Sequence, residues 1–175
     1  MIEPPLGAKV EKGTNMRKLI AALAATLVLL AATPSQAAGF SFNFLPSLIT
    51  GKPSVVAEVS ISQQRMVLSV TDKSGFVKTY IWKVSTGARG YATPTGAWEP
   101  TWLSINHVSK TYNNAPMPFA VFFKGGYAVH STDAVAKLGQ PASHGCVRLS
   151  KDNAAMFFSL VETYGKWNTK IVITR

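Results

Sequence analysis

Apolar and polar side chains alternate with a period of two between residues 54 and 84. The alternation is interrupted at 63–65 and again at 72–75, where Asp-Lys-Ser-Gly has the composition of a turn. A period of two places one face of a strand against the core and the other toward solvent. The pattern therefore predicts three strands in an antiparallel meander, over 54–62, 66–71 and 76–84.

The next stretch has no regular period. Three glycines and a proline within 85–96 predict a loop. The region that follows, up to Pro118, is long, aromatic and irregular. Long loops inside compact domains are usually functional, so we expect a lid or binding loop, with a packed surface excursion as the alternative. Tyr112 in this region is a candidate substrate contact.

Two apolar runs, at 119–123 and 127–130, flank Lys124-Gly125-Gly126. Paired glycines between two apolar runs are typical of a tight β-hairpin. This hairpin would place His130 at the end of a strand.

Two short helices are expected in the last third of the chain. Thr132 suits the N-cap of a helix over 133–138, which the following glycine would end. Ser150 suits the N-cap of a second helix, whose apolar residues recur at helical spacing over 154–164. A final strand is expected around 171–173. The excess of strands over helices predicts a mainly β domain.

The first 37 residues have the features of an export signal. A positive start, Met16-Arg17-Lys18, precedes an apolar run over 19–32 and small residues up to Ala37. We expect residues 1–37 to be an N-terminal extension and a signal peptide that starts at Met16 and is cleaved after Ala37. Residues 38–53 would be a linker. A membrane span needs about 20 apolar residues, so we expect none after cleavage; an uncleaved anchor is the alternative.

Composition and charge narrow the class of protein. Hydrophobic residues make up 47% of the 175-residue chain and charged residues 15%, as in a globular protein. The formal net charge is +10. The scattered cations form either an ordinary solvated surface or one that is attracted to an anionic cell wall or membrane. No nucleic-acid motif is present, and nucleic acid is not an expected partner.

The only cysteine of the chain, Cys146, lies in Ser143-His144-Gly145-Cys146-Val147-Arg148-Leu149. One cysteine excludes an internal disulfide, and in an exported protein it suggests a free reactive thiol. A thiol nucleophile needs a base, and His130 upstream is the candidate. No acidic residue is an obvious partner for this histidine, so a backbone carbonyl could orient its ring.

The neighbours of Cys146 suggest supporting roles. Gly145 fits a tight turn that brings backbone N–H groups close to a substrate carbonyl. Arg148 could hold this turn or bind a substrate carboxylate. The alternatives are an inert buried thiol and a metal site made of His130, His144 and Cys146, whose spacing matches no common zinc pattern. We expect neither a metal nor a cofactor.

These motifs resemble the L,D-transpeptidase catalytic domain, also called the YkuD domain. The hallmark of that family is a histidine, a spacer of about this length, and Ser-His-Gly-Cys followed by an apolar residue and Arg or Asn; here these are His130 and Ser143 to Arg148. The resemblance runs from about Ser54 to the C-terminus, which makes 54–175 the expected catalytic domain. Further matching motifs lie at 85–87, 93–96, 115–118 and 125–127.

The resemblance implies a YkuD-like β-sandwich of mixed and antiparallel strands with two short helices. It assigns Cys146 as the nucleophile and His130 as the general base and acid, with the Ser131 carbonyl orienting the imidazole. Many family members have glycine where this chain has Ser131. The remaining implied site residues are His144, Gly145 and Cys146, whose N–H groups form the oxyanion hole, and the substrate contacts Ser143, Arg148 and Tyr112.

The implied reaction is acyl transfer on peptidoglycan. Cys146 would attack the third residue of a stem tetrapeptide, release D-Ala and form a thioester, which a second stem would resolve into a 3→3 cross-link. Carbapenems would acylate the same thiol. We expect an exported monomer in the periplasm or cell envelope, with stem peptides as partners. A carboxypeptidase, a protein-anchoring transferase and a non-catalytic wall-binding module are the alternatives.

Overall fold

The structure is a computed structural model that describes residues 52–175. The predicted extension, the signal peptide and most of the predicted linker lie outside this range.

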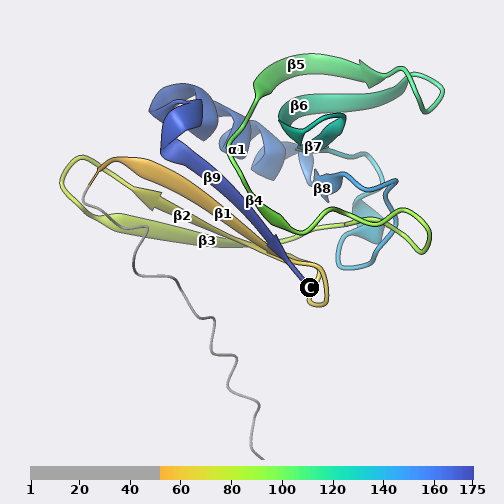
Figure 1. Ribbon diagram of the computed structural model, residues 1–175, viewed down its shortest axis with the longest axis horizontal. Coiled ribbons are helices and arrows are strands. Elements are labelled where there is room, and N and C mark those ends of the chain that lie inside the picture. Colours follow the sequence, from red (N-terminus) through yellow and green to blue (C-terminus); the bar gives the residue numbers. More distant parts are fainter. Residues whose placement is uncertain (1–51) are drawn as a thin grey trace, which may run out of the picture. The chain divides into compact units, whose positions relative to one another are not determined.

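The described residues form two β-sheets (Figure 1). The five-stranded sheet has the order β3-β2-β1-β9-β4, and the four-stranded sheet has the order β5-β6-β7-β8. The strands of the first sheet are β1 (Ser54–Ser60), β2 (Arg65–Thr71), β3 (Val77–Lys83), β4 (Gly96–Trp98) and β9 (Thr169–Thr174). Those of the second are β5 (Trp102–Ser109), β6 (Ala115–Lys124), β7 (Tyr127–Ser131) and β8 (Val147–Leu149).

The predicted meander is present. β1 pairs antiparallel with β2, and β2 pairs antiparallel with β3. The turn between β2 and β3 is held by the Asp72 carboxylate, which accepts hydrogen bonds from the backbone N–H groups of Ser74 and Phe76. The C-terminal strand β9 then pairs parallel with β1, in the middle of the sheet. This long-range pairing has no local signal in the sequence.

The prediction of an irregular aromatic region was wrong. Residues 96–118 form β4, β5 and the first part of β6. β5 is an edge strand, and none of its residues is fully buried, so its sequence shows no clear alternation. Pro116 and Pro118 in β6 also argue against a strand, because proline has no N–H to donate to a ladder.

One of the two predicted helices is an α-helix. α1 (Lys151–Tyr164) begins after Ser150, whose hydroxyl accepts a hydrogen bond from the backbone N–H of Asn153, and ends at Gly165. Its buried face consists of Ala154, Phe157, Phe158 and Val161.

The other predicted helix is only a 3-10 turn, η2 (Val135–Lys137), and a second such turn, η3 (Lys166–Asn168), follows α1. None of the η2 side chains is buried, so packing gives residues 133–138 no support for a longer helix. No helix in the described part of the chain is long and apolar enough to cross a membrane.

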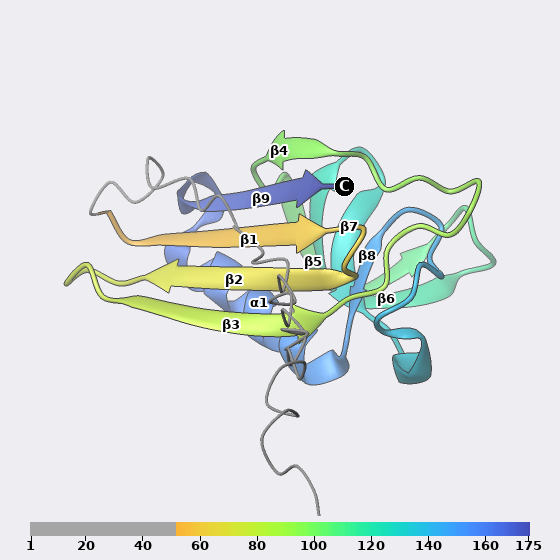
Figure 2. The same cartoon turned by 90° about the horizontal axis from the view of Figure 1, so that it is seen from below.

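The main core lies between the two sheets and α1, which covers the inner face of the five-stranded sheet (Figure 2). Alternation along β7 and β8 divides their side chains between two faces. Val129, Val147 and Leu149 belong to the main core, whereas Ala128 and Cys146 pack with a small second cluster on the opposite face. The candidate nucleophile Cys146 therefore lies on the face of the four-stranded sheet that points away from the main core.

Candidate active site

The parallel pairing of β7 with β8 brings His130 and Cys146 together from distant parts of the sequence. His130 lies opposite Arg148 in this ladder, and Cys146 directly precedes β8. Paired residues in a sheet share a face, and residues two apart along a strand also share it. The side chains of His130, Cys146 and Arg148 therefore project from the same face.

The far edge of β8 is held by the loop that follows β3. Ser85 and Arg148 exchange backbone hydrogen bonds of 3.0 and 2.9 Å. The loop itself is fixed by Gln64, which bonds both the hydroxyl and the backbone N–H of the fully buried Thr86. The strand that follows Cys146 is therefore held on both edges although it has only three residues.

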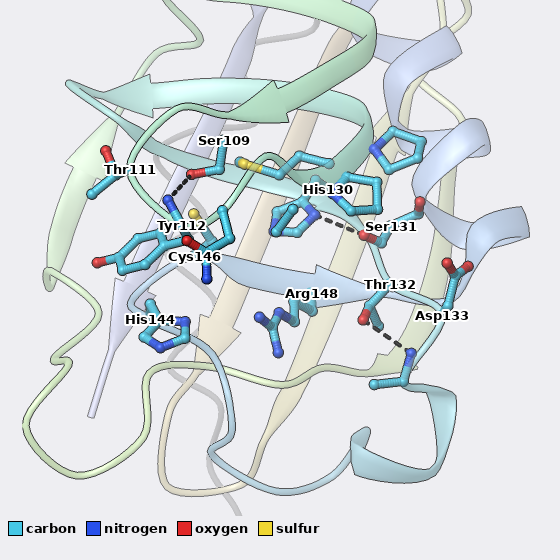
Figure 3. Close-up of a pocket in the computed structure, with 16 residues that line it drawn as sticks. Ser109, Thr111, Tyr112, His130, Ser131, Thr132, Asp133, His144, Cys146 and Arg148 are labelled. Carbon is cyan, nitrogen blue, oxygen red and sulfur yellow. Dashed lines mark hydrogen bonds between the residues drawn. The ribbon is translucent and has the colours of Figure 1, made fainter.

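A cavity of about 600 Å³ opens beside this face. Figure 3 shows that its walls come from the turn after β5, the end of β7 and the start of β8. Of the expected site residues, it is lined by Cys146, His130, Ser131, His144, Arg148 and Tyr112. The structure brings these six together; Gly145 and Ser143 lie in the turn behind them.

The imidazole of His130 is buried, and its Nδ1 lies 2.7 Å from the carbonyl oxygen of Ser131. A carbonyl oxygen can only accept a hydrogen bond, so Nδ1 carries the proton in this contact. The neutral ring then has an unprotonated Nε2. The side chain of Ser131 takes no part in this contact, so the difference from the glycine of many family members leaves it intact.

Burial lowers the pKa of His130 to about 4, which outweighs the opposing effect of the hydrogen bond to Ser131. The positive charge of Arg148, and to a smaller extent His107, lowers the pKa further. His130 is therefore neutral at pH 7 and can accept a proton.

Burial also raises the pKa of the Cys146 thiol, although the backbone N–H of Ala128 and the charge of Arg148 act in the opposite direction. The resting site thus contains a neutral thiol and a neutral imidazole. It is not a preformed thiolate–imidazolium pair, so the thiol proton has to leave during nucleophilic attack.

The turn before Cys146 requires glycine at position 145. Gly145 has a φ of +108°, and a Cβ there would lie 2.5 Å from Cε1 of the Tyr127 ring. The hydroxyl of Ser143 braces the turn, because it donates to the Cys146 carbonyl at 2.6 Å and accepts from the Gly145 N–H at 3.0 Å.

These hydrogen bonds involve two of the expected site residues besides Cys146. Ser143 is 1% exposed and does not line the cavity, and its hydroxyl is engaged in the turn. The Gly145 N–H, one of the three expected oxyanion donors, is bonded to the Ser143 hydroxyl inside the turn. The Arg148 guanidinium donates to the Ala142 carbonyl at 3.1 Å, as expected for a residue that holds the turn, and Arg148 also lines the cavity.

An aromatic stack stands at the mouth of the cavity. The ring of His144 lies 4.3 Å from that of Tyr112 in a stacked arrangement, and 4.5 Å from that of Tyr91 in an edge-to-face arrangement. Tyr112 belongs to the β5–β6 turn and Tyr91 to the loop after β3, so three separate segments meet here. Tyr91 was not predicted, because nothing local distinguishes it from other loop tyrosines.

The cavity has one carboxylate among its lining residues, Asp133, which was also not singled out from the sequence. No group of three or more His, Cys, Asp or Glu side chains that could hold a metal ion is found within residues 52–175.

Comparisons with known proteins place the chain near one family. A family model of the L,D-transpeptidase catalytic domain matches residues 54–173. No curated protein matches the chain.

Several solved structures are similar. An L,D-transpeptidase from Mycobacterium tuberculosis H37Rv is 23% identical with a TM-score of 0.60, over 70% of this chain and 58% of that one. An L,D-transpeptidase in complex with imipenem is 24% identical with a TM-score of 0.59, over 70% and 59%. An L,D-transpeptidase from Stackebrandtia nassauensis is 25% identical with a TM-score of 0.58, over 71% and 57%. The chain thus spans less than two thirds of the length of each.

Proposed function

The chain belongs to the family of L,D-transpeptidase catalytic domains, and we propose that it is a cysteine-dependent acyltransferase that cross-links peptidoglycan stem peptides. The observation that carries this proposal is the pair of Cys146 and His130 on one cavity, with the histidine oriented by the Ser131 carbonyl. A neutral imidazole beside a neutral thiol is suited to general-base activation of the sulfur at the moment of attack.

In the proposed first half-reaction, the Cys146 sulfur attacks the carbonyl of the third residue of a stem tetrapeptide, and its proton moves to Nε2 of His130. The oxyanion that forms is bound by the backbone N–H groups of His144 and Cys146. Cleavage of the amide bond then produces a thioester on Cys146 and releases D-Ala, whose amine takes the proton from His130.

In the second half-reaction, the side-chain amine of another stem attacks the thioester and transfers a proton through His130. The thiol is restored and a 3→3 cross-link is formed. A second cavity of about 190 Å³, which also contains Cys146, adjoins the first and is lined by Tyr127 and Gly126. Two cavities that meet at one sulfur provide space for both a donor and an acceptor peptide.

The direct test is incubation of the protein with tetrapeptide-bearing muropeptides, followed by mass analysis of the products. We expect 3→3 dimers from the wild type and none from Cys146→Ala. Equal amounts of dimer from both proteins would overturn the proposal. Intact mass after treatment with a carbapenem gives a second readout, in which the wild type gains one acyl group and Cys146→Ala gains none.

The same product analysis identifies the acceptor. Tripeptides without dimers would indicate that water resolves the thioester, as in a carboxypeptidase, and peptides attached to a protein amine would indicate an anchoring enzyme. Binding to peptidoglycan without any acylation of Cys146 would indicate a non-catalytic module.

We further propose that residues 54–175 form the catalytic domain of an exported protein of the cell envelope, which acts there as a monomer. The apolar run at 19–32 and the small residues up to Ala37 support export. N-terminal sequencing of the secreted protein would show whether cleavage follows Ala37, and light scattering would give its oligomeric state.

A further inference from the structure

One end of the domain exposes large apolar side chains beside lysines. Trp167 in η3 is 83% exposed and Phe76 after the β2–β3 turn is 65% exposed, more than any other large apolar side chain of the described residues. Because the Trp167 side chain is so exposed, packing within the domain does not explain a large aromatic residue at this position. Trp167 is therefore a candidate for contact with another surface.

The two aromatic residues are close in sequence to residues that line one groove. A depression of about 640 Å³ is lined on one side by the β2–β3 turn and on the other by the end of α1 and η3. Phe76 follows the lining residue Ser74 by two positions, and Trp167 directly precedes the lining residue Asn168. We call this region the basic aromatic end and define it by Phe76, Trp167, Lys52, Lys73 and Lys166.

Three lysines lie at this end. Lys52 and Lys73 are exposed, and Lys166 is partly exposed and donates to the Thr101 carbonyl at 2.6 Å. The opposing charges nearby are Asp72, whose carboxylate is held by the Ser74 and Phe76 N–H groups, and Glu162 near the end of α1.

The basic aromatic end is also where the N-terminal segment joins the domain. Ser54 starts β1, and Val55 pairs with Thr169, two residues beyond Trp167. The loops and turns that line the active-site cavity lie at the opposite end of the domain (Figures 1 and 2).

We propose that the basic aromatic end binds an anionic phospholipid surface and so directs the active-site cavity away from it. Tryptophan favours the boundary between headgroups and acyl chains, and lysines beside it are attracted to lipid phosphates. A second copy of this chain is a poorer occupant, because a symmetric contact would bring the lysines of both copies together. The proposal does not depend on the reaction catalysed at Cys146.

The test places an environment-sensitive dye next to the proposed contact. In the full chain with Cys146→Ser, a single cysteine is introduced as Asn168→Cys at the basic aromatic end. The matched control is Val135→Cys, an exposed site on the active-site side of the domain that is 53% exposed. Both proteins keep the apolar run at 19–32, so the Trp167→Gln variant is what separates binding by the basic aromatic end from binding by that run.

With vesicles of phosphatidylglycerol and phosphatidylcholine, we expect a blue shift of the dye at position 168 and none at position 135. Adding Trp167→Gln should abolish the shift. Lys73→Gln should raise the lipid concentration that gives half of the shift about fivefold at low salt.

Equal shifts at both positions, an equal shift with pure phosphatidylcholine, or a shift that persists in Trp167→Gln would each overturn the proposal. A shift without vesicles would show self-association instead. Circular dichroism of each variant confirms that it is folded.

Discussion

The two faces of the β7–β8 pair differ in function although they belong to the same two short strands. The inward face carries Val129, Val147 and Leu149, all completely buried in the core. The outward face carries His130, Cys146 and Arg148 beside a cavity. The inward face holds the strands in place, and this allows the outward face to keep a buried histidine neutral and close to a thiol. The first three predictions below each concern one face of this pair, and the last concerns the mouth of the cavity.

The largest effect is expected from Cys146→Ser on the outward face. A serine hydroxyl is far less acidic than a thiol, and a histidine with a pKa of about 4 is too weak a base to activate it. We expect loss of transpeptidation by about a thousandfold or more with little change in the free energy of unfolding. Product formation and urea denaturation measure the two quantities. A variant that loses both together would mean that Cys146 is primarily a core residue.

On the inward face, Leu149→Ala should do the opposite. Removing a fully buried leucine typically lowers the free energy of unfolding by about 2–5 kcal/mol. Under conditions in which the variant is folded, its rate of transpeptidation per folded molecule should stay within a few-fold of the wild-type rate. Ile81→Ala is the matched control, because Ile81 is 63% exposed on a different sheet and should cost less than about 0.5 kcal/mol. An inactive but folded Leu149→Ala would remove the distinction between the faces.

The pH dependence of stability tests the burial of His130. Its pKa is about 4 in the folded protein against an ordinary value of 6.5, so between these values the unfolded chain binds more protons. The stabilisation from the neutral histidine is complete above about pH 6.5 and is lost as the pH falls toward 4, by about 3 kcal/mol.

Denaturation of the wild type and of His130→Asn at pH 7, 5.5 and 4 isolates this contribution, because the carboxylates titrate in both proteins. We expect the wild type to lose more stability than the variant on acidification. Parallel stability curves would show that folding does not lower the pKa of His130.

The smallest effect is expected at the mouth of the cavity. Tyr112→Ala removes the ring stacked on His144, which is worth about 1 kcal/mol. We expect KM for the stem peptide to rise about 3- to 10-fold with little change in kcat. Tyr112→Phe keeps the stacking and should behave like wild type. If the phenylalanine variant is equally impaired, the hydroxyl group and not the ring makes the contact.

Much of the fold was predictable wherever a segment packs against the core on one face only. β1 and α1 have clear periods because their inward residues are buried and most of their outward residues are partly or fully exposed. β5 was not predictable, since it is an edge strand that buries neither face completely. The helix expected over 133–138 reduced to a 3-10 turn, because a capping threonine cannot stabilise a short helix that buries no side chain.

For the site, the sequence alone indicated the candidate residues: one cysteine, a histidine upstream of it, and a glycine turn between them. Only the tertiary structure decided what surrounds them. The parallel β7–β8 ladder makes His130 a neighbour of Cys146. Burial sets the direction of the pKa shift of both residues. The Ser143 hydroxyl points into the turn, where it donates to the Cys146 carbonyl. The stack of Tyr91, His144 and Tyr112 joins three distant segments. Desolvation and contacts between distant segments depend on the complete packing of the chain, and for this reason no local pattern specified them.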